Sequence, residues 1–357
     1  MLADITLRTF RNYDSLSLRV SPGINLIHGR NGHGKTNLVE AVFLLSTGRL
    51  LRGGKDADCI QHGQDEARVV GTCAGDETEI NVQLNRHHKK RITINGVSVV
   101  RASDVLGRLP SVTFIPEDLA LVSGEPAERR LYLDSALSQA LPGYLNHLAA
   151  YKRALQHRNA LLKLAQNEMV DDGSFAVWEQ PLHDHGIELR RHRTEFLDSI
   201  SSDAKNVYRE LSGGELFSLH YAPKDEGSLI DELRQTRQLD IRRGATQLGP
   251  HRDDIALELM GTDLRTFGSQ GQRRSAAITL KLCELIYLDR IMKKKPMLLL
   301  DDIFSELDHR RRENLLRVGF ASADQVFITC TEIDNFHKQL IDDAATFRVE
   351  SGTVIAE

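Results

Sequence analysis

Near its start the sequence contains the octapeptide Gly29-Arg30-Asn31-Gly32-His33-Gly34-Lys35-Thr36. It matches the pattern GxxxxGK(S/T) at every fixed position, after a short apolar run at residues 24–27 and before an amphipathic stretch expected to be helical up to Gly48. In that setting, loop N–H groups and a helix N-terminus converge on phosphate oxygens. The sequence therefore predicts that residues 29–36 bind a nucleotide, with Lys35 on the β- and γ-phosphates and the Thr36 hydroxyl on Mg²⁺.

A dinucleotide-binding loop is the obvious alternative for a glycine-rich turn after a strand. Its GxGxxG pattern, started at Gly29, would need a third residue that is glycine, and position 31 is asparagine. The spacing of the glycines therefore favours a nucleoside triphosphate over a dinucleotide as the ligand.

A second apolar run, residues 297–300, ends in two acids, Asp301 and Asp302. An unbroken apolar run of this length is typical of a strand buried on both faces of a parallel sheet. Adjacent carboxylates at the end of such a strand are costly unless a cation and phosphates share the site. We expect Asp301 to bind Mg²⁺ and Asp302 to orient or deprotonate an attacking water. The plainer interpretation is a strand end with two solvated acids.

The next residues, Ser305-Glu306-Leu307-Asp308, resemble the D-loop of ABC-type ATPases, which lies at their dimer interface. Such enzymes also need a signature loop that opens a helix facing the partner's γ-phosphate. The sequence LSGGE at 211–215 is followed by an alternating, strand-like pattern, so we interpret it as a turn. A degenerate SGGQ opens a predicted helix from Gln272 to about Met292, and we assign Ser269, Gly271 and Gln272 as the signature.

Length and composition restrict the class of protein. The chain has 357 residues, a net charge of −4, 41% hydrophobic and 27% charged residues, which is ordinary for a soluble protein of two domains. No apolar run approaches the ~18 residues of a membrane span, and the N-terminus lacks a signal-peptide pattern. We expect a cytoplasmic protein with no membrane partner. Its four cysteines form no CxxC pair and are expected to be reduced: Cys59, Cys73, Cys283 and Cys330.

Periodicity divides the chain into three stretches. Residues 1–120 read as the N-terminal part of an ATPase head, with strand alternation over 67–115 and a hairpin turn at Asn95-Gly96. Residues 121–245 read as a helical arm of two helices, each of roughly 25 to 35 residues, with a break between them at 171–174. Packed antiparallel, they would form an arm about 40 to 50 Å long. Residues 246–357 read as the rest of the head. The predicted class is α/β: an ABC-type P-loop ATPase head, a mixed sheet with helices, plus a helical second domain inserted as an antiparallel arm.

Together these motifs resemble the RecF family of bacterial recombination-repair ATPases over nearly the whole chain. The resemblance also includes Phe10-Arg11-Asn12, residues 114–118, Arg129-Arg130, Leu133-Asp134 and the GPHRDD stretch at 249–254. It implies a protein that binds ATP and DNA, dimerises with ATP, and helps the RecO and RecR mediators load RecA at single-stranded gaps and single/double-strand junctions. Links to replication restart and the SOS response follow from the same resemblance.

Three positions depart from the wider ABC superfamily. Glu117 or Asp118 stands where a Q-loop glutamine is usual, and Thr329 or Thr331 stands where a switch histidine is usual. The second acid of the strand is Asp302 rather than glutamate. These substitutions predict slow ATP hydrolysis that serves as a conformational switch, and the resemblance to the RecF family implies that this weak hydrolysis depends on DNA.

Contacts with DNA are left open by the sequence. A hairpin tip carries Arg86, Lys89, Lys90 and Arg91, and the second arm helix carries Arg190, Arg191 and Arg193. Each group could bind phosphates or be a solvated basic face. His183 and His185 are two residues apart on a helix, point to different sides and are not expected to form a metal pair.

Four other kinds of protein would share part of this pattern. An ABC transporter subunit or a chromosome-structuring head would share the loop, the acidic strand and the D-loop, but the transporter lacks the long helical insertion and the chromosome-structuring head needs a far longer coiled coil. A P-loop small-molecule kinase would need neither signature nor D-loop. A nucleotide-gated scaffold without turnover remains compatible with every motif.

Overall fold

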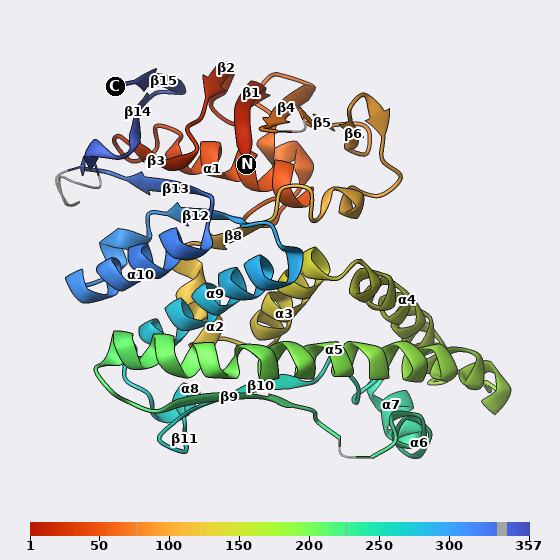
Figure 1. Ribbon diagram of the computed structural model, residues 1–357. Helices are drawn as coiled ribbons and strands as arrows, with labels where there is room; N and C mark the ends of the chain where they lie inside the picture. The colour runs from red at the N-terminus through yellow and green to blue at the C-terminus, as the bar shows by residue number, and fades with distance from the viewer. Residues whose placement is uncertain (76, 226, 334–340) are drawn as a thin grey trace. The chain divides into compact units, whose positions relative to one another are not determined.

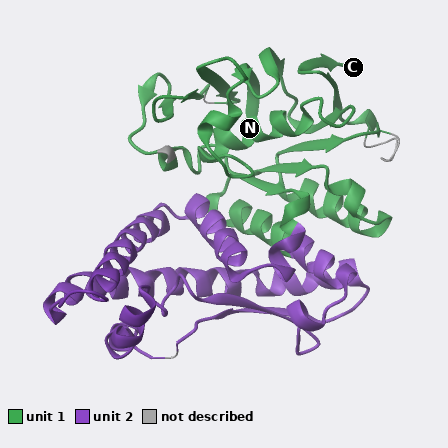
Figure 2. Cartoon of the chain, turned by 180° about the vertical axis from the view of Figure 1, so that it is seen from behind, with its two compact units in different colours: residues 1–118, 280–357 green, residues 119–279 purple. Residues whose placement is uncertain are grey.

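The computed structural model describes residues 1–75, 77–225, 227–333 and 341–357. Internal contacts divide the chain into two compact units, residues 1–118 with 280–357, and residues 119–279 (Figure 2). The arm boundary set at 245 by the sequence therefore differs from the structure, in which the second unit continues to Thr279. The physical reason is that strand β10 (Asp254–Leu259) pairs with β9 (Phe217–Ala222) of the second unit.

The first unit contains two sheets. One is antiparallel, in the order β2-β1-β4-β5-β6-β7. Its strands alternate buried and exposed side chains, as in β4, where every second residue from Ala67 is buried. The Asn95-Gly96 turn joins β6 to β7 with positive φ at both residues, as predicted. The strands are β1 (Leu2–Phe10), β2 (Tyr13–Arg19), β4 (Glu66–Cys73), β5 (Glu79–Asn85), β6 (Arg91–Ile94) and β7 (Val97–Ser98).

The other sheet of this unit is mixed, in the order β15-β14-β3-β13-β12-β8. All neighbours are parallel except β15, which is antiparallel to β14. The central strands β12 and β13 are buried along their whole length, which explains their unbroken apolar runs. The strands are β3 (Gly23–His28), β8 (Ser111–Phe114), β12 (Met297–Asp301), β13 (Gln325–Cys330), β14 (Ala345–Glu350) and β15 (Thr353–Ala356).

Helix α1 (Lys35–Thr47) contacts strands of both sheets, and its apolar residues join one core with them (Figure 1). Leu38, Val42 and Leu45 are at most 1% exposed. The helix ends at Gly48, which has a φ of +67° and closes the last turn with a bond to Leu44 O. Helix α10 (His309–Ser322) begins at Asp308, whose side chain caps the Arg311 N–H.

The second unit is mainly helical. Helices α4 (Pro142–Leu164) and α5 (Asp172–Ser212) run antiparallel, because Tyr144 lies against Arg193 while Arg158, further along α4, meets Glu179. The predicted break falls at their connection, where Asp171 caps α5 through the Ser174 N–H. The helices are unequal: α4 has 23 residues and α5 has 41, about 35 and 60 Å.

The remaining elements of this unit surround that helix pair in Figure 1. A small antiparallel sheet, β11-β10-β9, packs against α5. No helix among the described residues is both long and apolar enough to cross a membrane. The elements are α2 (Ala120–Ser123), α3 (Pro126–Ala140), α6 (Leu229–Gln235), α7 (Arg237–Arg243), β11 (Thr262–Asp263), α8 (Leu264–Phe267) and, up to Thr279, the first part of α9 (Gln270–Met292).

Candidate functional site

The predicted phosphate loop connects β3 to α1, as its sequence context requires. Gly29, Gly32 and Gly34 all have φ between +80° and +141°, a region that side-chain-bearing residues rarely adopt. A Cβ at Gly29 would lie 2.4 Å from the Val349 carbonyl oxygen, and one at Gly34 would lie 2.7 Å from the Asn12 side chain. Glycine is thus needed at both positions for conformation and for space.

Neighbouring turns hold the loop in this conformation. The Asn12 side-chain amide donates to the His33 carbonyl at 2.8 Å, and the Tyr13 hydroxyl donates to the Gly34 carbonyl at 2.9 Å. The Gly352 N–H, in the turn between β14 and β15, donates to His33 O at 3.1 Å. The sequence marked residues 10–12 only by their resemblance to the family. The structure adds that Asn12 braces the loop.

Lys35 begins α1 and turns its side chain back into the loop. Its ammonium donates to the carbonyl oxygens of Gly29 at 2.7 Å and of Arg30 at 3.1 Å. Burial lowers the pKa of Lys35, and the nearby charge of Asp302 opposes that shift. A partly desolvated ammonium whose nearest oxygens are neutral carbonyls is a strong attractor for an anion.

Thr36 and Asp301 meet where the loop and β12 end. The Thr36 hydroxyl donates to Asp301 Oδ1 at 2.9 Å, and the Thr329 hydroxyl of β13 donates to the same atom at 2.8 Å. Asp301 is fully buried, and its Oδ2 accepts no hydrogen bond. The structure thus brings together the two predicted Mg²⁺ ligands, and a buried carboxylate oxygen that accepts no hydrogen bond fits a divalent cation.

Asp302 follows directly and has a left-handed backbone, with a φ of +52°. This conformation is uncommon outside glycine, and such residues cluster at functional sites. Its N–H donates to Thr329 Oγ1 at 2.9 Å, so Thr329 rather than the exposed Thr331 contacts the acidic pair. Burial and the charge of Asp301 raise the pKa of Asp302. A carboxylate with a raised pKa is a better proton acceptor.

Arg52 is a residue that the sequence analysis missed. Its guanidinium lies 3.5 Å from Asp301 Oδ2 and 3.2 Å from Glu117 Oε1. Of the two candidates for the Q-loop position, Glu117 is therefore the one connected to the acidic strand. Asp118 instead accepts from the Ile115 N–H at 2.9 Å, with Lys281 4.0 Å away. A single arginine in the loop after α1 belongs to no short motif, so the sequence carried no signal for it.

The signature candidate lies at the start of α9 in the second unit. The Gln272 N–H donates to Ser269 Oγ at 3.2 Å and the Ser269 N–H donates to Gln272 Oε1 at 2.7 Å, which is a reciprocal helix cap. Gln270 is already helical, two residues before the predicted start. The LSGGE stretch is a turn, with Gly213 and Gly214 at φ of +88° and +125°, followed by β9 as predicted.

The basic hairpin tip is less free than its sequence suggests. Arg86 donates to four backbone carbonyls, Gln64, Ala57, Ile60 and Gln61. Lys90 pairs with Asp56 at 3.1 Å, and Arg91 donates to the Ser98 hydroxyl. Lys89 is exposed. It is the member of this group that is best placed to meet a phosphate.

The arginines of α5 contradict the solvated-face interpretation. Arg190 forms bidentate pairs with Asp225 and Asp253. Arg193 is 2% exposed and donates to Asp134, Tyr144 and the Pro250 carbonyl. Only Arg191 is exposed, and it pairs with Glu188 and Glu195. Because charged residues are rarely buried, the sequence pattern pointed to the surface.

The cysteines form no disulfide, and all four are buried. His185 contacts His147 of α4, with 3.1 Å between their Nδ1 atoms. Among the described residues, no cluster of three or more His, Cys, Asp or Glu is arranged to hold a metal ion.

The phosphate loop after β3, the acid pair after β12 and the mixed sheet that carries both define the head fold of ABC-type and SMC proteins. A family model described as "RecF/RecN/SMC N terminal domain" matches residues 1–353. The Smc head domain of Pyrococcus furiosus has a TM-score of 0.57 at 15% identity, covering 100% of this chain and 96% of that one. At this identity the likeness concerns the fold alone.

Closer relatives identify the family. "DNA replication and repair protein RecF" of Symbiobacterium thermophilum is 38% identical, over 100% of this chain and 98% of its own, and that of Listeria monocytogenes is 35% identical over 99% of each. A solved structure of "the recombination mediator protein RecF-ATP in RecFOR pathway" superposes with a TM-score of 0.91 at 31% identity, covering 100% and 97%. The chain belongs to the RecF family of DNA replication and repair proteins. The transporter and kinase interpretations are thereby excluded.

Proposed function

We propose that this chain is an ATP-dependent DNA-binding switch of recombinational gap repair and replication restart. The observation that carries the proposal is the 2.9 Å contact between Thr36 of the phosphate loop and the buried Asp301 at the end of β12. These two groups come from segments 265 residues apart. Their meeting beside Lys35 is what a site for Mg·ATP requires.

In this proposal residues 29–36 hold the phosphates of ATP, and Thr36 and Asp301 hold Mg²⁺. Two protein ligands suffice because Mg²⁺ usually keeps waters and is bound through one or two carboxylates plus substrate phosphates. When bound, the ion supplies positive charge that stabilises the phosphates. Asp302, with its raised pKa, accepts the proton of the attacking water. Its short side chain and the absence of a switch histidine beside Thr329 favour slow turnover.

We further propose that ATP joins two copies of the chain. Ser269, Gly271 and Gln272 of a second copy would contact the γ-phosphate and complete the site. Support comes from their place at the first turn of α9, since a helix N-terminus attracts anions. Hydrolysis then separates the copies, so that ATP acts as a timer.

The finer biological role is inferred from the family. The solved relative is described as a recombination mediator in the RecFOR pathway. By analogy we propose that the dimer binds single-stranded DNA and single/double-strand junctions, and that RecR and RecO are its partners. RecA loading and SOS induction would follow. DNA would stimulate a weak ATPase activity.

Sedimentation velocity of Asp302→Asn with and without Mg·ATP, at fixed low salt, tests the switch. We expect a dimer that persists only with ATP, because the variant keeps the phosphate loop and loses the proton acceptor. Lys35→Met is the control and should stay monomeric under the same conditions. A monomeric Asp302→Asn protein under saturating ATP would refute the scheme. A wild-type dimer without measurable turnover would instead favour the non-hydrolysing scaffold.

DNA binding is tested separately with Lys89→Glu at the hairpin tip. Removing one phosphate contact should weaken binding to all sequences and reduce the salt slope by about one. Lys205→Glu, an exposed position on α5, is the matched control. Equal loss in both variants would mean that the hairpin tip has no special role.

A further inference from the structure

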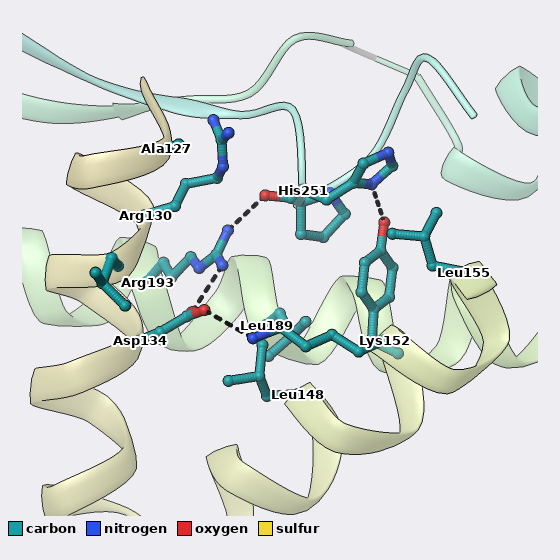
Figure 3. A pocket seen from close by; sticks show the side chains of 12 residues that line it. Ala127, Arg130, Asp134, Leu148, Lys152, Leu155, Leu189, Arg193 and His251 are labelled. Atoms are coloured by element: carbon teal, nitrogen blue, oxygen red, sulfur yellow. Dashed lines mark hydrogen bonds and ion pairs between the residues drawn. The ribbon is translucent and has the colours of Figure 1, made fainter. Parts of the chain in front are cut away.

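The second unit contains a pocket of about 250 Å³ between α3, α4, α5 and the turn at 249–251 (Figure 3). We call it the α3–α5 pocket. None of its residues belongs to the loop, the acidic strand or the signature. It is lined by Ala127, Arg130, Leu131, Asp134, Leu148, Tyr151, Lys152, Leu155, Leu189, Arg193, Pro250 and His251.

All three helices contribute leucine side chains to the wall. Leu148 and Leu189 are buried, while Leu131 at the rim is 62% exposed. A leucine this exposed gains no stability from its contact with water, although a single exposed leucine is not unusual. Together with the buried leucines it forms an apolar surface that is continuous from the rim to the floor.

The polar groups in the pocket wall are mutually satisfied. The Tyr151 hydroxyl bonds His251 Nδ1 at 2.7 Å, and His251 Nε2 lies 3.1 Å from the Thr246 carbonyl oxygen. Burial lowers the pKa of His251 to about 4, so the ring is neutral at physiological pH. Arg193 is neutralised by Asp134 at 2.9 Å. The interior of the pocket therefore offers a ligand an apolar contact rather than a charge.

The mouth of the pocket, by contrast, is cationic. Arg130 is half-buried, and its guanidinium donates to the Asp253 carbonyl at 2.9 Å. Within the described part of the chain it has no carboxylate at ion-pair distance. Burial and the charge of Arg193 lower the pKa of Arg130, and the charges of Asp254 and Asp253 oppose that shift. Lys152 is 64% exposed and lies 3.7 Å from Asp134.

We propose that the α3–α5 pocket binds an acidic segment of a partner protein, which inserts one bulky apolar side chain while its carboxylates pair with Arg130 and Lys152. The pocket is smaller than the roughly 300 to 1,000 Å³ of sites for drug-sized ligands, so it suits a single side chain better than a cofactor. Apolar anchors in desolvated pockets, ringed by charges, are the usual energetic centre of such interfaces.

Nucleic acid fits the same features less well. A phosphate would pair with Arg130 but leave the leucine wall empty. A base would need an aromatic face to stack on, whereas the wall is mainly aliphatic and the Tyr151 and His251 rings are held to each other. Charge and apolar surface together favour the acidic peptide.

Fluorescence anisotropy with defined peptides tests the proposal. The probe is a labelled peptide with one central Phe flanked on both sides by Asp residues. Two control peptides replace Phe by Ser, or every Asp by Asn. We expect saturable binding of the probe by the full chain, and affinity at least about tenfold lower for each control, because each lacks one half of the recognition.

Two exposed substitutions locate the binding, and each has a matched control. Leu131→Glu should lower the affinity for the probe peptide about tenfold. Val177→Glu, which changes a residue of α5 with the same exposure of 62%, should leave that affinity unchanged. Lys152→Glu should lower the affinity for the probe peptide by a similar factor. Arg153→Glu, which changes the next residue of α4, should leave it unchanged. All four changes are at exposed positions, so they leave the core of the unit intact.

Three results would overturn the inference. The probe could fail to bind wild-type protein, it could bind all four variants equally, or a single-stranded oligonucleotide could displace it and lose affinity in the same two variants. The last result would assign the pocket to DNA. None of these outcomes depends on ATP, so failure here is distinct from failure of the proposed switch.

Discussion

Glu215 Oε1 accepts a hydrogen bond from Gln272 Nε2 at 2.7 Å. The contact joins the LSGGE turn to the segment that we assign as the signature. Because Gln272 Oε1 already accepts from the Ser269 N–H, both ends of its amide are occupied. The turn with the familiar signature sequence therefore contacts and supports the start of α9.

Glu215→Ala should loosen the start of α9 without affecting the phosphate loop. A hydrogen bond to a charged group contributes about 1.5 to 3 kcal/mol, so the ATP-dependent dimer should weaken at least about tenfold. Sedimentation velocity measures the dimer, and a fluorescent ATP analogue measures binding by the monomer, which should be unchanged. Glu168→Ala, an exposed position at the end of the arm, is the control. If Glu215→Ala lowered nucleotide binding by the monomer as much as it weakened the dimer, Glu215 would act only on overall stability.

Lys35→Met should remove ATP binding without destabilising the free protein. The ammonium is partly desolvated and bonds only neutral loop oxygens, so replacing it with an apolar side chain leaves no buried charge unpaired. Saturating ATP at a hundred times its Kd should stabilise wild type by about 2.7 kcal/mol. Thermal denaturation should show this shift in wild type and in Lys163→Met, but not in Lys35→Met. A large fall in the Tm of the nucleotide-free variant would contradict the prediction.

Arg158→Met should destabilise the second unit strongly. Arg158 is fully buried and joins three helices, with bonds to Glu179 of α5 at 3.1 Å and to Asp240 of α7 at 2.7 Å. Removing one member of a buried ion pair leaves an uncompensated charge and costs about 3 to 5 kcal/mol. Urea unfolding followed by circular dichroism measures the loss. The exposed Arg153→Met should change stability by less than about 0.5 kcal/mol. Similar values for both variants would mean that the network contributes little.

The stability of the protein should fall in mild acid because of His251. Burial holds the pKa of this ring at about 4 in the folded chain, whereas the unfolded chain protonates it near about 6.5. The unfolded state therefore binds more protons between these values, and the free energy of unfolding decreases as pH falls through that window, by up to about 3 kcal/mol. In His251→Gln this decrease in the free energy of unfolding with falling pH should vanish. In His62→Gln, which changes an exposed histidine, it should remain. Parallel slopes in all three proteins would refute the assignment.

Local patterns predicted much of the head. The glycine loop, the buried run that became β12, and the Asn95-Gly96 turn all depend on neighbours within a few residues. The split of the arm at 171–174 was visible for the same reason, because Asp171 caps the helix that follows. The choice of the second signature candidate also rested on a local feature, the strand pattern after the LSGGE turn.

What the sequence did not contain were partners distant along the chain. Asn12 braces the loop from another turn, and Arg52 meets Asp301 across more than two hundred residues. Arg190 and Arg193 read as surface cations because their acidic partners lie far away in the sequence. The boundary at 245 failed similarly, since only the pairing of β10 with β9 assigns the later segment to the second unit.

The position of β3 has a consequence for how the protein is made. This strand leaves the ribosome early, yet both of its neighbours in the sheet are synthesised last: β13 begins at Gln325 and β14 at Ala345. Until then the strand that carries the phosphate loop has unpaired edges and must wait for its neighbours. A product of premature termination would contain the complete motif but not the sheet that shapes it. The loop that β3 carries is therefore held in its sheet only after the chain has been made as far as β14.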